Sequence, residues 1–145
     1  MPLTLRDATI EDQPTIRQIV RAANINPTGL DWPRFIVAED AGAIVGVGQV
    51  KPHRDGTREL ASIAVLPARQ GQGIGTAIIQ DLVRRENATL HLTCRSRLQG
   101  YYERFGFRRL ESRDYPPYFA RMLPILNTLG RFFRVQVIVM RRLSS

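Results

Sequence analysis

Residues 59–77 read ELASIAVLPARQGQGIGTA, a small and apolar run that leads through a proline into a glycine-rich turn. The composition of residues 59–65 is typical of a central strand that is covered on both faces, and Pro67 ends it. Beyond the turn, apolar side chains from Ile74 to Val83 recur at helical spacing, and this pattern ends near Asn87. The stretch therefore predicts a strand, a tight turn and a helix in direct succession.

The turn Gln70-Gly71-Gln72-Gly73-Ile74-Gly75 has the chemistry to hold an anion. Glycine has no Cβ atom, so the backbone adopts unusual dihedral angles and approaches a ligand closely. The first N–H groups of a helix have no acceptor within it, and the helix dipole adds a partial charge of about +0.5 at that end. A pyrophosphate is the natural ligand for such a turn. A tight turn between packed elements, without any ligand, is the alternative.

The spacing of the glycines excludes two other phosphate-binding motifs. Gly71, Gly73 and Gly75 are two residues apart, whereas the dinucleotide fingerprint is G-x-G-x-x-G. A P-loop requires Gly-Lys followed by Ser or Thr, and Gly75-Thr76 lacks the lysine. Phosphoryl transfer from a nucleotide is therefore not expected.

The remainder of the chain predicts further helices and strands. Thr9 followed by Asp12 resembles a helix N-cap with an acidic first turn, and residues 40–42 resemble a hairpin turn. Gly46 and Gly48 permit a bulge or close packing. We expect strands at 3–8, 34–39, 43–50, 90–94, 107–112 and 134–143, helices from Thr9 to about Asn24 and at 98–105, and at 116–131 a helix broken by Pro124 and Gly130. This order predicts a parallel pair around the crossover helix, in a mixed sheet with helices on both faces.

Length and composition predict a single domain over residues 1–145. The chain has 145 residues, of which 43% are hydrophobic, enough for a sizeable core. Its first residues lack a basic and then apolar leader pattern, and no apolar run reaches about 18 residues, so we expect a soluble, cytoplasmic protein without a membrane segment. Cys94 is the only cysteine, which excludes an intramolecular disulfide and a cysteine-based metal site, and no metal is expected.

The charge of the chain favours anionic ligands. The formal net charge of +8 comes from 21 basic against 13 acidic residues, and every basic residue except Lys51 is arginine. Such an excess attracts phosphate-bearing ligands of any kind. The arginines are spread along the chain, without the interleaved aromatic residues of known nucleic-acid motifs. Nucleic acid is therefore not an expected partner.

The glycine turn resembles the cofactor signature of the GNAT superfamily of acetyl-CoA-dependent N-acetyltransferases, which is a glutamine or arginine, two residues, glycine, one residue, then glycine or alanine. Residues 63–67 resemble the strand ending that precedes this signature, and residues 101–107, YYERFGF, resemble the second signature of the superfamily. The three matches occur in the right order. The resemblance implies an α/β fold of mixed α+β type, with a central mixed, mostly antiparallel twisted sheet of about seven strands and helices on both faces. Residues 116–131 are the least typical part.

The resemblance also implies acetyl-CoA as a co-substrate. The backbone of Ile63, Ala64 and Val65 is expected to pair with the pantetheine arm. The pyrophosphate is expected at the turn, where the cofactor-binding residues are Gln70, Gly71, Gln72, Gly73, Ile74, Gly75 and Thr76. Arg95 and Arg97 are candidates for contacts with the adenosine phosphates.

Acetyl transfer to an amine requires an acid for the departing sulfur and a base for the amine. The resemblance implies Tyr102 as the acid, because it occupies the tyrosine of the second signature and a phenol is protonated at neutral pH. The alternative is a core aromatic residue. Glu59 lies where relatives place a carboxylate base, and the alternative is an exposed charge at a strand end. His53, in a predicted turn, is expected to be solvated, His91 is a weaker candidate, and Cys94 is expected to be a small buried hydrophobe.

The sequence therefore predicts an N-acetyltransferase that passes the acetyl group of acetyl-CoA to a primary amine by direct attack in a ternary complex. The amine belongs to a small molecule or to a protein, and its identity stays open. The alternative is a non-catalytic, acetyl-CoA-binding GNAT-like module that acts through a protein partner. Residues 116–131 either cover the acceptor site or only pack, and the apolar C-terminal strand offers a surface for a homodimer.

Overall fold

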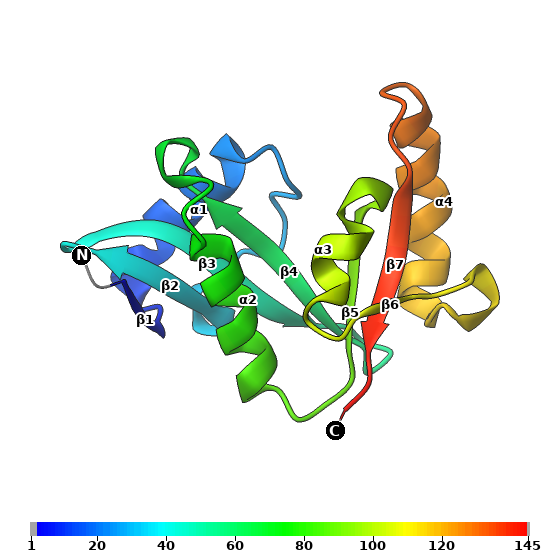
Figure 1. Ribbon diagram of the computed structural model, residues 1–145, viewed down its shortest axis with the longest axis horizontal. Helices are drawn as coiled ribbons and strands as arrows, with labels where there is room; N and C mark the ends of the chain where they lie inside the picture. The colour runs from blue at the N-terminus through cyan, green and yellow to red at the C-terminus, as the bar shows by residue number, and fades with distance from the viewer. Residues whose placement is uncertain (1–2, 145) are drawn as a thin grey trace. The chain divides into compact units, whose positions relative to one another are not determined.

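The computed structural model describes residues 3–144 and confirms the predicted class of fold (Figure 1). Its strands are hydrogen-bonded in the order β1-β2-β3-β4-β5-β7-β6. The pairs β1–β2, β2–β3, β5–β7 and β6–β7 are antiparallel, whereas β4–β5 is parallel. The elements are β1 (Thr4–Asp7), α1 (Gln13–Ala22), β2 (Phe35–Asp40), β3 (Ala43–Pro52), β4 (Arg58–Val65), α2 (Ile74–Arg85), β5 (Leu90–Arg95), α3 (Gln99–Glu103), β6 (Arg108–Arg109), α4 (Pro117–Arg131) and β7 (Val137–Arg142).

The chain forms two compact units. The first contains the residues up to Lys51 together with Leu60–Arg85, and the second contains Pro52–Glu59 together with the residues from Glu86 onward. Strand β4 contributes to both units, because its first two residues belong to the second unit and the others to the first.

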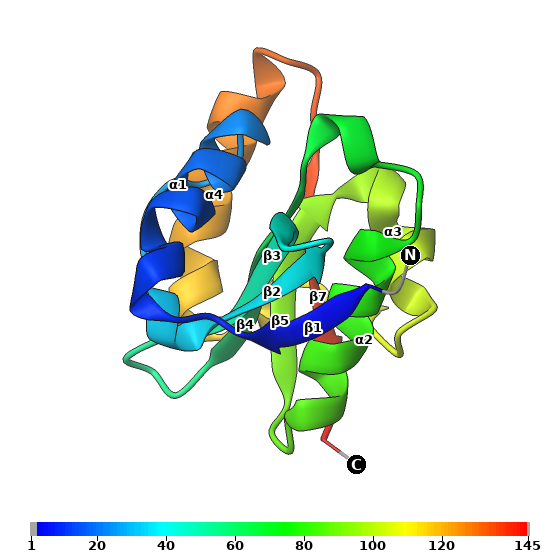
Figure 2. The same ribbon diagram turned by 90° about the vertical axis from the view of Figure 1, so that its left-hand side faces the viewer.

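In the first unit, α1 and α2 lie on opposite faces of the strands (Figure 2). The apolar stripe of α1 packs with alternate residues of β2 and β3, as the helical and two-residue periodicities require. This core cluster includes Ile16, Ile19, Val20, Phe35, Val37 and Val47. The predicted cap at Thr9 is present, since its backbone N–H donates to the Asp12 carboxylate at 2.7 Å. A short 3-10 turn, Ile10–Asp12, separates this cap from α1.

Strand β3 gives α2 close access to the sheet. A Cβ atom on Gly46 would lie 2.9 Å from Ile78 Cδ1, and one on Gly48 would lie 2.6 Å from Ile78 Cγ2. Such separations are shorter than carbon atoms tolerate, so a larger residue at either position would force the isoleucine side chains of α2 to shift. The predicted close packing is therefore confirmed, and a bulge also occurs where the β2–β3 register shifts at Ala38/Glu39.

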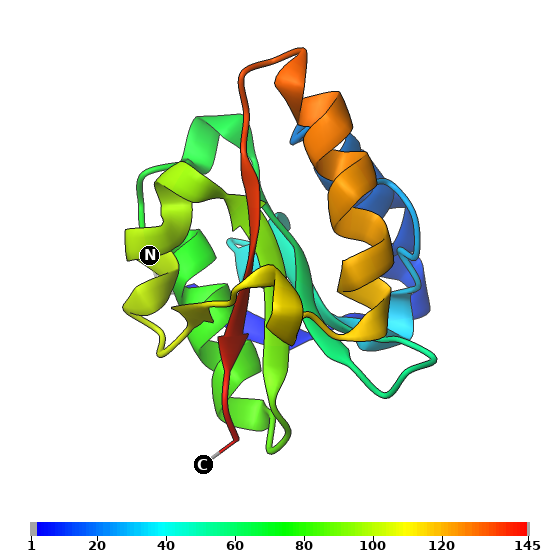
Figure 3. The same ribbon diagram turned by 90° about the vertical axis from the view of Figure 1, so that its right-hand side faces the viewer.

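In the second unit, α3 and α4 lie on opposite sides of β7 (Figure 3). Strand β5 pairs with β7 along its whole length, from Leu90 opposite Arg142 to Arg95 opposite Val137. Phe119 and Leu123 of α4 pack with Val139 of β7 and with Leu110 in one core cluster.

Two predictions in this unit are wrong. The strand predicted at 107–112 is only Arg108–Arg109. The segment predicted as a broken helix, 116–131, is one helix, α4, that continues through Pro124. Proline in a helix interior costs about 3 kcal/mol, and the burial of Phe119 and Leu123 offsets this cost. Neither α4 nor any other helix within residues 3–144 is long and apolar enough to cross a membrane.

Replacing Gly48 by alanine tests the close packing of α2. We expect Gly48→Ala to lower the free energy of unfolding by about 1–3 kcal/mol, because Ile78 and the sheet must move apart. Gly100→Ala is the matched control, since nothing lies within 4 Å of a Cβ atom there. The control should raise stability by up to about 1 kcal/mol, as for other helical glycines. Equal effects in urea denaturation would contradict this account.

Candidate active site

The glycine-rich turn of the first unit has the backbone conformation that the sequence predicts. Gly71 and Gly73 have φ angles of +78° and +81°, in the left-handed region that favours glycine. No atom lies within 4 Å of the place where a Cβ atom would stand on either residue. Packing therefore does not require glycine at these positions. Glycine is favoured because the backbone is left-handed and because a ligand can approach that backbone closely.

Helix α2 begins immediately after this turn, at Ile74. Its first internal hydrogen bond is donated by Ala77 N–H to the Gly73 carbonyl at 3.0 Å, so the amides of Ile74 and Gly75 precede the regular bonding pattern. The dipole of this helix of twelve residues adds positive potential at the same place. Turn and helix together fit an anionic group.

Side chains fix the shape of the turn from outside. Arg69 donates to Gln72 Oε1 at 2.9 Å and to Asp40 Oδ2 at 2.7 Å. The side-chain amide of Gln70 donates from Nε2 to the Val65 carbonyl at 3.3 Å, which links the turn to the end of β4. Arg69 is therefore held between Asp40 and Gln72.

Strand β4 contains a backbone irregularity that the sequence does not announce. Ser62 has a φ of +58°, a conformation that costs a non-glycine residue about 1–2 kcal/mol. The fully buried Gln49 donates to Ser62 Oγ at 2.9 Å and to the Gly29 carbonyl at 3.0 Å, and it accepts from Arg34 at 3.1 Å. This network holds the irregularity directly before Ile63, Ala64 and Val65.

In the second unit, Glu59 forms a buried pair with His53. Glu59 Oε1 lies 2.8 Å from His53 Nε2, and the two side chains are only 12% and 10% exposed. The His53 ring stacks on Tyr118 with a centroid distance of 3.6 Å. The expectation that His53 is solvated is therefore wrong, because the hairpin turn folds its ring against the start of α4.

Asp55 joins this hairpin to α4. The Tyr118 N–H donates to Asp55 Oδ2 at 3.0 Å, and the Thr57 N–H donates to Oδ1 at 2.8 Å. Hydrogen bonds from the Thr57 side chain and then from these two amides lower the pKa of Asp55 to about 2. Burial, and then the charge of Glu59, raise the pKa of Tyr118. The carboxylate of Asp55 thus accepts from one amide of its own hairpin and from one at the N-terminus of α4.

The rings of His53, Tyr118, Phe119 and His91 contact one another in succession, and we call this series the aromatic row. His91 is the cross-strand neighbour of Glu59, it is 8% exposed, and its ring stacks on Phe119 at a centroid distance of 5.7 Å. Its Nδ1 is buried without a hydrogen-bond partner. Burial, and then the charge of Arg141, lower the pKa of His91. The histidine is therefore neutral at pH 7.

Tyr102 lies on the other face of β5. Its ring contacts Phe107 edge-on at 6.2 Å, and burial raises its pKa, so the phenol stays protonated. Cys94 shares this face and is buried, with its sulfur 3.8 Å from that of Met140, and burial raises its thiol pKa to about 11. Cys94 is therefore the buried hydrophobe that the sequence predicts.

The predicted residues thus fall into three groups. Residues 63–65 and 70–76 gather at the end of β4 in the first unit, while Glu59 and Tyr102 belong to the second unit and lie toward opposite faces of β5. Arg95 and Arg97 are exposed at the end of β5. Sequence reasoning missed Ser62 and the role of His53. In the hairpin, His53 is hydrogen-bonded to Thr57. Glu59 is two residues beyond Thr57 and so lies on the same face, and this register is the signal that could have placed His53 beside Glu59.

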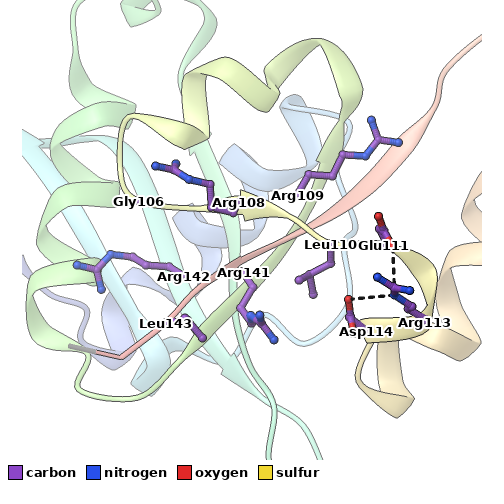
Figure 4. A pocket seen from close by; sticks show the side chains of 10 residues that line it. All are labelled: Gly106, Arg108, Arg109, Leu110, Glu111, Arg113, Asp114, Arg141, Arg142 and Leu143. Atoms are coloured by element: carbon purple, nitrogen blue, oxygen red, sulfur yellow. Dashed lines mark ion pairs between the residues drawn. The ribbon is translucent and has the colours of Figure 1, made fainter.

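The second unit also has a surface depression of about 550 Å³, which we call the arginine depression (Figure 4). None of the residues predicted from the sequence as catalytic or cofactor-binding lines it. Its lining consists of Gly106, Arg108, Arg109, Leu110, Glu111, Arg113, Asp114, Arg141, Arg142 and Leu143. In the part of the chain that the structure describes, no three His, Cys, Asp or Glu side chains are grouped to hold a metal ion.

A glycine turn opening a helix after a β-strand, within this seven-stranded order, defines an acetyltransferase-like class of fold. The model of the acetyltransferase (GNAT) domain matches residues 31–109, more than half of the chain. The protein therefore belongs to the GNAT acetyltransferase family.

Three known proteins are similar to this chain. Mycothiol acetyltransferase of Rhodococcus jostii (strain RHA1) is 36% identical over 81 residues, which are 54% of this chain and 26% of that protein. N-acetylglutamate synthase of Neisseria gonorrhoeae, solved with coenzyme A and N-acetyl-glutamate, has a TM-score of 0.77 at 16% identity over 100% of this chain and 36% of its own. The ribosomal-protein alanine N-acetyltransferase of Escherichia coli has a TM-score of 0.70 at 24% identity, over 99% and 95%. The chain thus spans about a quarter of the first protein and about a third of the second.

The lowered pKa of His91 predicts a pH dependence of stability. Unfolding returns the pKa of the imidazole to about 6.5, so below that pH the unfolded state binds a proton that the folded state resists. The contribution is present above about pH 6.5 and is lost as the pH falls toward the folded value. We expect the pH slope of the unfolding free energy between pH 7 and 5 to be shallower in His91→Gln, by at most about 1.4 kcal/mol per pH unit. Identical slopes in denaturant titrations would refute this.

Proposed function

We propose that this protein transfers the acetyl group of acetyl-CoA to a primary amine by direct attack in a ternary complex. The observation that carries the proposal is the left-handed backbone at Gly71 and Gly73, which opens α2 within the cofactor signature of the family. This backbone turns amides outward at a helix start, where a pyrophosphate gains both hydrogen bonds and the helix dipole. Residues 1–145 are proposed to act as one domain.

The cofactor-binding residues follow from this placement. Backbone groups of Gly71, Gln72, Gly73, Gly75 and Thr76 are proposed to hold the pyrophosphate, with Gln70 beside them. Ile63, Ala64 and Val65 are proposed to hydrogen-bond the pantetheine arm. The left-handed Ser62 supports this role, because it breaks the regular pattern of the strand directly before these residues. Arg95 and Arg97 are proposed to approach the adenosine phosphates.

The chemical step needs one proton removed and one delivered. The amine nitrogen forms a bond to the thioester carbonyl carbon, the carbon–sulfur bond breaks, and the products are an amide and a free thiol. We assign removal of the amine proton to Glu59, directly or through water, and its pairing with His53 supports a carboxylate held in one orientation. We assign protonation of the sulfur to Tyr102, whose phenol is kept protonated by burial.

Acid and base act on different atoms in this scheme. The base must reach the amine and the acid must reach the sulfur, which lie on either side of the carbonyl carbon. The placement of Glu59 and Tyr102 toward opposite faces of β5 supports this division. A backbone N–H near Ile63 is proposed to polarise the carbonyl. His53 is proposed as a positioning residue for Glu59.

The acceptor is proposed to be the amino group of a small molecule or of a protein. Similar proteins carry names for both kinds of acceptor, which supports the class and not one member of it. The proposed homodimer through the C-terminal strand and the cytoplasmic location stay predictions.

A thiol-release assay with acetyl-CoA over a panel of amines tests the proposed function. Release of coenzyme A that depends on one amine, with matching amide formation, is the expected result. If acetyl-CoA raises the melting temperature but no amine is acetylated, the binding-module alternative replaces it.

Removing the Tyr102 hydroxyl tests the general acid. We expect Tyr102→Phe to lower kcat by about 100-fold or more, since proton transfer of this kind contributes 10²–10⁴. Tyr101→Phe makes the same chemical change on the neighbouring ring and should leave kcat within about threefold. An unchanged kcat in Tyr102→Phe would exclude Tyr102 from the mechanism.

Replacing the Glu59 carboxylate tests the general base. We expect Glu59→Gln to lower kcat, and the loss should become smaller as the pH rises and more of the amine is already neutral. His53→Gln should lower kcat by less than Glu59→Gln, with the same trend with pH, because it removes only the partner that orients Glu59. A loss in Glu59→Gln that is equal at all pH values would point to a structural role instead.

A further inference from the structure

The arginine depression carries an unusual concentration of like charge. Arg108 and Arg141 are direct cross-strand partners in the β6–β7 pair, and Arg109 and Arg142 are their neighbours in sequence. Like charges directly opposite each other destabilise a strand pair. The Arg108–Arg141 pair is therefore a local cost that the fold keeps, and Arg109 and Arg142 add charge beside it on the alternate face of the strands.

The two acidic residues of the depression do not neutralise these four groups. Glu111 and Asp114 both pair with Arg113, at 3.1 and 3.9 Å from its Nε. Figure 4 shows Arg113 between these two carboxylates, while the other four arginines extend from the strand pair without one. Across residues 3–144, no carboxylate forms an ion pair with Arg108, Arg109, Arg141 or Arg142.

Two of the four arginines are held in place by the backbone. Arg108 Nη1 donates to the Phe107 carbonyl at 3.0 Å, and Arg142 Nε donates to the Phe105 carbonyl at 3.0 Å. These bonds orient the guanidinium groups and leave their charge uncompensated. Residues 115–145 contain five arginines and no acidic residue, so no carboxylate from α4 or β7 can serve instead.

We propose that the arginine depression binds a small ligand with two or more linked phosphate groups. One guanidinium group binds two oxygens of a phosphate through parallel hydrogen bonds. A ligand with several linked phosphates can therefore pair with more than one of these arginines. The volume of about 550 Å³ lies in the usual range for small-molecule sites. Leu110 and Leu143 add apolar lining for a non-phosphate part of the ligand.

This site shares no residue with the proposed acetyl-CoA turn. The turn belongs to the first unit, whereas every lining residue of the depression belongs to the second. Arg141 also connects the depression to the aromatic row, because it is the cross-strand partner of His91. A ligand bound at Arg141 changes the field at the His91 ring, so His91 reports occupancy without any assay of acetyl transfer.

The test uses the whole chain and inorganic tripolyphosphate as the probe, with titration calorimetry and NMR of the His91 ring. With coenzyme A present in excess to occupy the turn, we expect one further tripolyphosphate per chain and a shift of the His91 resonances on addition. Arg109→Gln with Arg141→Gln removes two arginines that have no ion pair, and should weaken binding more than about tenfold. Arg17→Gln with Arg21→Gln, two exposed positions of α1, lowers the net charge equally and should change binding less than about twofold. Cooperative thermal unfolding of both variants without ligand, with no drop in melting temperature, will confirm that they fold.

Four results would overturn the proposal. Equal weakening in both double variants would show attraction by net charge alone. Citrate binding as tightly as tripolyphosphate would contradict the phosphate class. Tighter binding of a single-stranded oligonucleotide, per phosphate, would indicate an extended nucleic-acid surface instead. Loss of the tripolyphosphate signal in a Gly73 variant, with no loss in Arg109→Gln with Arg141→Gln, would place the ligand at the turn.

Discussion

The contact of α2 with the two glycines of β3 is the constraint on which the cofactor turn depends. Gly46 and Gly48 let Ile74 and Ile78 approach the sheet at distances that any larger residue would prevent. This contact fixes where α2 begins, and the turn must then connect the end of β4 to that point within residues 66–73. Left-handed glycines make the connection possible and expose amides at the helix start. Packing on one face of the sheet thereby positions the backbone that we propose to hold the pyrophosphate.

In the second unit, charge and aromatic packing shape the groups that we assign to catalysis. Asp55 ties the hairpin to α4 through the Tyr118 amide, and this brings Tyr118 over His53. His53 in turn bonds Glu59, so a carboxylate at a strand end becomes a buried and oriented group. Burial acts differently on the far face of β5, where it keeps the Tyr102 phenol protonated. One short strand thus separates the proposed proton acceptor, Glu59, from the proposed proton donor, Tyr102.

The parts of this structure that local sequence determines could be predicted, and the parts set by distant contacts could not. Gly71 and Gly73 revealed the turn because their conformation excludes other residues. The left-handed Ser62 depends on Gln49, thirteen residues away, and has no local signal. The His53–Glu59 pair required the register of a hairpin, and the continuity of α4 depends on buried contacts that outweigh Pro124. The arginine depression joins segments that only the β6–β7 pairing brings together.

Titration calorimetry of coenzyme A with the native chain, Gly73→Ala and Gly42→Ala tests the central claim most directly. Both glycines have a φ of +81° and open space at the Cβ position, so the two substitutions impose the same backbone strain. Gly42 lies in the β2–β3 hairpin, whereas Gly73 lies in the turn. The account predicts that Gly73→Ala weakens binding at least about tenfold while Gly42→Ala binds like the native chain. Equal affinity in all three proteins, or no binding to the native chain, would contradict it.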